Sequence, residues 1–107
     1  QMEKTLVIDG KEVTLKGTGG LPLRYKMQFG KDYFAEIAKM ASGKKVNTDQ
    51  IDMEVFYNLT WTMAKTADKT IPSPLEWFDS FDSFPIDEVF PAVQDILMHV
   101  MQTTKKK

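Results

Sequence analysis

The sequence predicts a mostly helical α+β fold, in which an N-terminal β-hairpin is followed by about five helices packed as one small domain. A length of 107 residues is enough for one domain. A turn-forming Asp9-Gly10 pair lies between two short runs that suit β-strands. After residue 20, apolar residues recur at helical spacing, and strands do not alternate with helices as they do in a parallel α/β fold.

Residues 2–16 are expected to form the hairpin. A two-residue type I′ turn at Asp9-Gly10 fixes the register so that Leu6 lies opposite Val13. Four apolar residues then share one face of the hairpin: Leu6, Ile8, Val13 and Leu15. Because an isolated two-stranded hairpin is marginal in water, this face must be covered by helices, or other strands must pair with the hairpin.

The helical part is expected to span residues 22–103. We interpret residues 17–20, Gly-Thr-Gly-Gly, as a flexible break before it. A phosphate-binding loop is disfavoured because no Gly-Lys-Ser/Thr follows and no second parallel strand is present. A short helix should then begin with Pro22 in its first turn and end at Gly30. Two apolar pairs at i,i+4 spacing support this helix: Leu23 with Met27, and Tyr25 with Phe29.

Two further helices are predicted before residue 68. Asp32 can cap the first. Its apolar stripe should contain Phe34, Ile37, Ala38 and Ala41, with Gly43 at its end. Thr48 or Asp49 should start the second, which is expected to be the longest helix and to run to about Ala67. Its apolar residues follow the 3.6-residue period: Ile51, Val55, Phe56, Leu59, and Thr62 or Met63.

After a turn at residues 68–72, Ser73-Pro74-Leu75-Glu76 predicts another helix start. Ser73 caps it, Pro74 takes the first helical position and Glu76 completes a capping box. Trp77, Phe78 and Phe81 fall in this short helix, which ends at Phe84-Pro85.

The last helix should run from about Ile86 to Thr103, with Pro91 kinking it or splitting off its first turn. Its predicted core face contains Val89, Val93, Ile96, Leu97, Val100 and Met101. Residues 104–107 are expected to form a flexible basic tail.

Composition excludes several classes of function. The formal net charge is −1, and Arg24 is the only arginine, so a nucleic-acid partner is disfavoured. The chain has no cysteine and one histidine, His99, so no metal, cofactor or enzymatic activity is predicted. No apolar run approaches the ~20 residues that span a bilayer, and no signal peptide is visible. We therefore expect a soluble cytosolic protein without a membrane partner.

Two acidic constellations have plainer interpretations. Asp79, Asp82, Asp87 and Glu88 do not match a calcium loop, since the acids lack alternate spacing and a central glycine. Asp95 and His99 lie one helical turn apart, which fits a surface pair near a helix C-terminus.

The strongest local feature combines aromatic and acidic residues. Residues 68–95 contain seven acids and one lysine, a net charge of −6, whereas residues 1–67 carry +2 and the last 12 carry +3. Two interpretations remain open for the aromatic residues. Most belong to the core beneath a solvated acidic face, or some stay exposed as anchors for a partner. The predicted partner-binding residues are Trp77, Phe78, Phe81, Phe84 and Phe90.

Two motifs suggest a family. Residues 24–32 read Arg-Tyr-x-x-x-Phe-Gly-x-Asp, and residues 72–77 read Pro-Ser-Pro-x-Glu-Trp. With the N-terminal hairpin, their order resembles the tail assembly chaperones of long-tailed, non-contractile phages (siphoviruses) and prophages of Gram-positive bacteria. The resemblance spans about Leu6 to Met101.

The resemblance implies a chaperone that binds and solubilises the long helical tape measure protein and helps recruit the major tail protein. It implies action in the cytoplasm of the bacterial host, self-association, and absence from the mature virion. It also implies a form extended by a programmed −1 frameshift, for which the codons of Thr104 to Lys107 are the expected slip site; alternatively, these lysines only solubilise the chain end. The alternative function is a structural head–tail connector or tail terminator of the virion.

Overall fold

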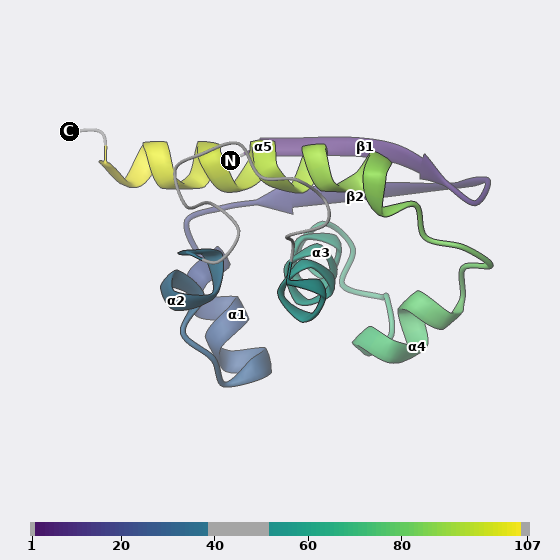
Figure 1. The fold of residues 1–107 in the computed structure, drawn as a ribbon, viewed down its shortest axis with the longest axis horizontal. Helices are drawn as coiled ribbons and strands as arrows, with labels where there is room; N and C mark the ends of the chain where they lie inside the picture. The colour runs from purple at the N-terminus through teal and green to yellow at the C-terminus, as the bar shows by residue number, and fades with distance from the viewer. Residues whose placement is uncertain (1, 39–51, 106–107) are drawn as a thin grey trace.

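The computed structural model describes residues 2–38 and 52–105, and it confirms the predicted fold as a hairpin followed by helices (Figure 1). Within these ranges the elements are β1 (Met2–Ile8), β2 (Lys11–Gly17), α1 (Leu21–Phe29), α2 (Tyr33–Ala38), α3 (Met53–Ala67), α4 (Pro74–Asp79) and α5 (Ile86–Lys105).

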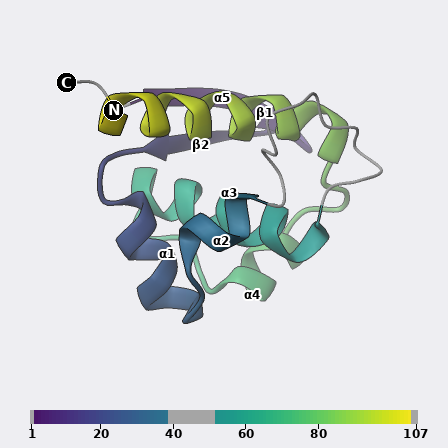
Figure 2. The ribbon, with the colours of Figure 1, turned by 60° about the vertical axis from the view of Figure 1, so that its left-hand side comes forward.

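The hairpin packs against two helices. α3 contacts β2, and α5 contacts both strands and runs beside them in both views (Figures 1 and 2). α1, α2 and α4 lie on the far side of the molecule from α5, with α1 packed against both α2 and α3. The helices therefore cover the apolar face of the hairpin, as its marginal stability alone requires.

The hairpin has the predicted turn and register. Asp9 and Gly10 have φ angles of 55° and 77°, as a type I′ turn requires, and Leu6 lies opposite Val13. Ile8 and Leu15 are fully buried on the inner face, whereas Val7 on the outer face is 66% exposed. The turn residues thus decide which side chains enter the core.

The interpretation of residues 17–20 as a flexible break is wrong at Gly17. This residue is the buried last residue of β2. A Cβ atom at this position would overlap the Cγ2 methyl of Ile96 and press on Val100, both in α5. The missing side chain is what allows the strand and the helix to come this close.

α1 and α2 have the predicted caps. Gly30 ends α1 in the left-handed conformation with φ 72°, and its N–H donates to the Lys26 carbonyl at 2.7 Å. The Asp32 carboxylate accepts a hydrogen bond from the Phe34 N–H at 3.0 Å. The stripe predicted for α2 is wrong at Phe34, which is 56% exposed, because Tyr33 enters the core with Ile37 instead. Ala41 and Gly43 lie outside the described residues.

α3 begins after Asp52, whose carboxylate accepts a hydrogen bond from the Val55 N–H at 3.2 Å. The expected starts Thr48 and Asp49, and Ile51, lie outside the described residues. The predicted core residues of α3 are buried: Val55, Phe56, Leu59, Thr62 and Met63. The prediction that this is the longest helix is wrong, since α3 has 15 residues and α5 has 20.

α4 starts at Pro74, with Ser73 in the capping position, but the Ser73 side chain forms no capping hydrogen bond, so the predicted capping box is incomplete. α4 ends at Asp79 and leaves Phe81 in the connection to α5. That connection is fixed by other contacts, described below.

α5 runs without a break through Pro91 and continues to Lys105, so Pro91 does not split off its first turn. Thr104 and Lys105, predicted to begin a flexible tail, are helical, and the rest of the predicted tail lies outside the described residues. Pro91 is exposed, and water can reach the carbonyl that loses its N–H partner there. The predicted core face is buried, with Met101 half-buried at its end. No helix of the described ranges combines the length and apolar character needed to cross a bilayer.

Candidate functional site

The five aromatic residues predicted to bind a partner differ in burial. Trp77, Phe81 and Phe90 are buried at 5–8% exposure, and Phe78 and Phe84 are half-buried against the core. Phe90 lies apart in α5 and contacts Phe56, with ring centroids 6.3 Å apart. A binding role for the three buried rings would therefore require part of the domain to open.

The other four rings pack on one another and on Tyr57 of α3. We call Tyr57, Trp77, Phe78, Phe81 and Phe84 the aromatic cluster. The ring centroids of Trp77 and Phe81 lie 5.2 Å apart, with an angle of 89° between the ring planes. For Phe78 and Phe84 the centroid distance is 5.0 Å and the interplanar angle is 88°. For Tyr57 and Phe78 the centroid distance is 4.7 Å and the interplanar angle is 79°. These edge-to-face contacts allow rings from one short segment to shield each other from water.

The tip of the hairpin holds the segment next to this cluster. The Lys11 ammonium donates to the Ser80 carbonyl at 2.8 Å and lies 4.8 Å from the centre of the Phe81 ring. The Asp9 carboxylate accepts from the Asp82 N–H at 2.8 Å. These contacts, which we call the hairpin-tip contacts, join residues about 70 positions apart in the chain.

The acids of this region face solvent: Glu76, Asp79, Asp82, Asp87 and Glu88. Within the described ranges, no group of three or more His, Cys, Asp or Glu side chains is placed to hold a metal ion. Asp68 forms a local turn, and the two hydrogen bonds it accepts from Thr70 lower the pKa of its carboxyl. Asp95 forms an ion pair with Lys4 at 3.2 Å, so it joins α5 to β1.

A second apolar surface, which the sequence interpretation missed, lies on α1 and the start of α2. Leu23 is 63% exposed, Met27 77% and Phe34 56%, and we call these three residues the α1 surface. A hollow of about 360 Å³ separates Leu23 from Phe34, with Pro22, Lys26, Asp32 and Tyr33 in its walls. Another of about 370 Å³ lies between α1 and α3, lined by Arg24, Met27, Gln28, Trp61, Thr62 and Lys65.

The sequence held a signal for this surface. At about 100° per residue, the pair Leu23–Met27 and the pair Tyr25–Phe29 lie on opposite sides of one short helix. Only one side can face the core, and Tyr25 is fully buried. Because α1 has nine residues and two apolar faces, the face that does not contact the core is expected to be exposed.

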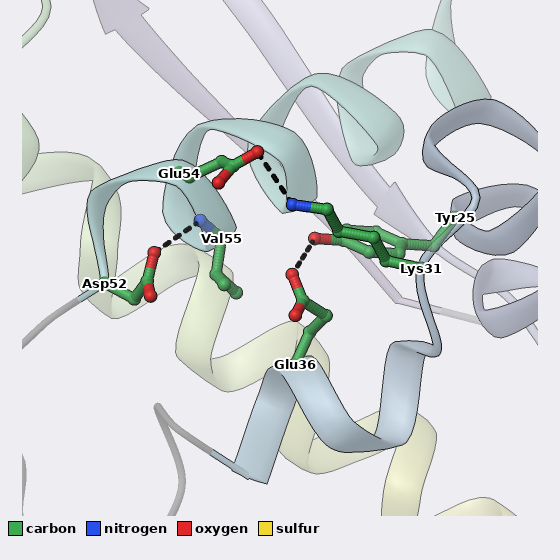
Figure 3. A network of polar contacts seen from close by, with 6 residues as sticks. All are labelled: Tyr25, Lys31, Glu36, Asp52, Glu54 and Val55. Carbon is green, nitrogen blue, oxygen red and sulfur yellow. Dashed lines mark hydrogen bonds and ion pairs between the residues drawn. The ribbon is translucent and has the colours of Figure 1, made fainter.

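Polar contacts join α1 to α2, and the turn between these two helices to α3 (Figure 3). The Tyr25 hydroxyl donates to the Glu36 carboxylate at 3.1 Å, and Lys31 pairs with Glu54 at 2.9 Å. Burial, and then the Glu36 carboxylate, raise the pKa of the Tyr25 hydroxyl far above its ordinary value. The buried Tyr33 hydroxyl has no hydrogen-bond partner among the described residues, and burial raises its pKa as well. The α1 surface is thus carried by an anchored pair of helices.

No protein-family model, curated protein or solved structure matches this chain. The resemblance to the phage chaperones therefore has the order of the sequence motifs as its only support.

Proposed function

We propose that this protein is a tail assembly chaperone of a long-tailed, non-contractile phage or prophage of a Gram-positive bacterium. It binds the tape measure protein in the host cytoplasm, keeps it soluble before the tail tube forms, helps recruit the major tail protein, and leaves before the virion is complete. The observation that carries the proposal is the α1 surface, where three large apolar side chains are exposed on two consecutive helices.

Both family-like motifs also have a physical role that fits a binding module. In the first, Tyr25 and Phe29 pack into the domain while Arg24 and Met27 face outward. In the second, Trp77 is buried while Glu76 faces solvent. Each motif therefore combines residues that stabilise the domain with residues that remain available to a partner.

Co-expression with the tape measure protein tests this proposal. We expect the soluble fraction of that protein to rise when this chain is present, and the two to elute together in size-exclusion chromatography. The matched control is co-expression with an unrelated acidic protein of similar size. An unchanged soluble fraction and separate elution would refute the proposal.

Two observations separate the chaperone from a structural component of the virion. Mass spectrometry of purified particles should find little or none of this protein, whereas abundant protein there would favour a head–tail connector or tail terminator. The gene should lie between those of the major tail protein and the tape measure protein. A slippery heptamer in the codons of Thr104 to Lys107, with an overlapping downstream frame, is expected for the extended form.

A further inference from the structure

We propose that the α1 surface binds an amphipathic helix whose apolar stripe is flanked by acidic residues. The inference rests on the proposed function, because it assigns the site and the chemistry of the helical partner. It assigns binding to Leu23, Met27 and Phe34 and not to the aromatic cluster.

The geometry of α1 places the apolar ridge outward. With Leu21, Tyr25 and Phe29 directed at the core, rotation of about 100° per residue puts Leu23 and Met27 on the opposite side of the helix. Their exposures of 63% and 77% agree with this placement. The domain therefore uses one face of α1 and leaves the other uncovered.

The same rotation puts a cation on each flank of the ridge. Arg24 lies toward α3, where it lines a hollow with Lys65, and Lys26 lies toward α2, where it lines a hollow with Leu23. Arg24 and Lys26 are both exposed, and within residues 2–38 and 52–105 neither forms an ion pair. Among the described residues, Asp32 is the one acid in the walls of the two hollows.

An apolar ridge between two cations selects the charge of its partner. A helix that covers Leu23 and Met27 brings the residues beside its own apolar stripe next to Arg24 and Lys26. Acidic residues there form charge-assisted contacts, whereas lysines are repelled. Apolar anchors at i, i+3 or i+4, and i+7 are the usual way in which such a helix docks.

The length of α1 sets the strength of each contact. A nine-residue helix is about 14 Å long, so it covers only about two and a half turns of a partner helix. One such contact is weak, and copies bound side by side along one long helix gain avidity only where they also contact one another. This arrangement suits a partner that must later be released from its chaperones.

The test uses two synthetic helical peptides with the same leucine stripe, one flanked by glutamates and one by lysines. Binding to the full chain is measured by fluorescence anisotropy. We expect the glutamate peptide to bind at least about tenfold more tightly than the lysine peptide. Equal binding of both peptides, or tighter binding of the lysine peptide, would overturn the proposal.

Matched variants locate the site. Leu23→Glu should weaken binding of the glutamate peptide about tenfold or more, whereas Leu75→Glu should leave it unchanged, since Leu75 is a leucine of similar exposure (74%) on another short helix. Arg24→Gln and Lys26→Gln should each weaken binding several-fold, and Lys69→Gln, an exposed lysine outside the surface, should not. Circular dichroism of every variant confirms that it folds. Equal loss in Leu23→Glu and Leu75→Glu would overturn the assignment.

Two further measurements exclude other occupants. Binding to phosphatidylglycerol vesicles that Leu23→Glu abolishes, without peptide binding, would reassign the surface to a membrane. Self-association that Leu23→Glu abolishes, without peptide binding, would reassign it to a second copy of this chain.

If Leu23→Glu still solubilises the tape measure protein, this inference fails and the proposed function stands. If the peptide binds but wild type leaves that protein insoluble, the proposed function alone fails.

Discussion

The aromatic cluster beside α4 and the α1 surface both combine large apolar side chains with charge, but they differ in sign and in exposure. The cluster lies in an acidic region, and its Trp77 and Phe81 are buried. The α1 surface lies between Arg24 and Lys26, and all three of its apolar residues are more than half exposed. The region with more aromatic residues therefore exposes a smaller share of its apolar side chains to a partner.

The difference shows that aromatic density in a sequence does not measure exposed apolar area. Rings spaced three residues apart, as in Phe78, Phe81 and Phe84, can turn toward each other and bury their own surface. An aliphatic pair on the outer side of a short helix, such as Leu23 and Met27, stays more than 60% exposed even with aromatic rings across the neighbouring hollows. Exposure depends on what a side chain finds nearby.

The largest expected effect on the free energy of unfolding tests whether the aromatic cluster belongs to the hydrophobic core. Trp77→Ala should lower the free energy of unfolding by about 3–5 kcal/mol, because it removes a buried ring with three aromatic neighbours. Leu75→Ala, an exposed neighbour on the same helix, should change it by less than about 0.5 kcal/mol. Urea denaturation measures both. A loss below about 1 kcal/mol for Trp77→Ala would show that the cluster is not part of the core.

A second variant tests how tightly the side opposite the α1 surface is packed. Gly17→Ala should lower the free energy of unfolding by about 1–3 kcal/mol, since the new methyl group overlaps Ile96. Gly19→Ala is the matched control, because nothing lies within 4 Å of its added carbon. Thermal melting of both variants decides the matter. Equal stability would mean that β2 and α5 can move apart freely.

A third variant tests the support of the α1 surface. Tyr25→Phe should lower the free energy of unfolding by about 1–2 kcal/mol, because the buried Glu36 carboxylate loses a hydrogen bond. Tyr33→Phe should cost less or stabilise the fold, since the Tyr33 hydroxyl has no partner within the described part of the chain. The same urea titration compares them. A larger loss for Tyr33→Phe would contradict the assigned contacts.

The two tyrosines also predict a dependence on pH. Their pKa values are raised in the folded protein, so both stay protonated up to the ordinary tyrosine pKa of about 10, and their contribution to stability is complete below that pH. Above it the unfolded chain ionises first, and the free energy of unfolding falls with rising pH. Tyr33→Phe should fall less steeply than wild type between pH 9.5 and about 11. Identical slopes would show that Tyr33 is not buried in the native state.

The smallest expected effect on stability comes from the α1 surface itself. Leu23→Ala should change the free energy of unfolding by less than about 0.5 kcal/mol, whereas Leu21→Ala, a buried leucine of the same helix, should lower it by about 2–5 kcal/mol. Chemical denaturation of the pair measures the contrast directly. Similar losses in both would mean that Leu23 is part of the core.

Local signals in the sequence were sufficient for much of the fold. The Asp9-Gly10 turn determined the register of the hairpin, and Pro22, Gly30 and Asp32 marked helix boundaries, because each acts within a few residues of its own position. The interpretation of Gly17 as part of a flexible break is wrong, because this position has no room for a side chain next to Ile96, and Ile96 is distant in the chain.

The candidate site was harder to predict than the fold. Composition pointed to residues 77–90, but whether an aromatic ring is buried depends on the tertiary neighbours that Tyr57 and Lys11 supply. The two-sided apolar pattern of α1 was visible, yet which side faces the core depends on its contacts with α2 and α3.

The hairpin-tip contacts impose an order on how the chain can fold as it is made. Asp9 and Lys11 wait for partners synthesised about 70 residues later, and α5, which covers the hairpin, comes later still. At ribosomal rates this delay is roughly 3–14 s. During that interval α3 can cover part of the apolar face of the hairpin, but the part that packs against α5 stays uncovered until α5 has been made.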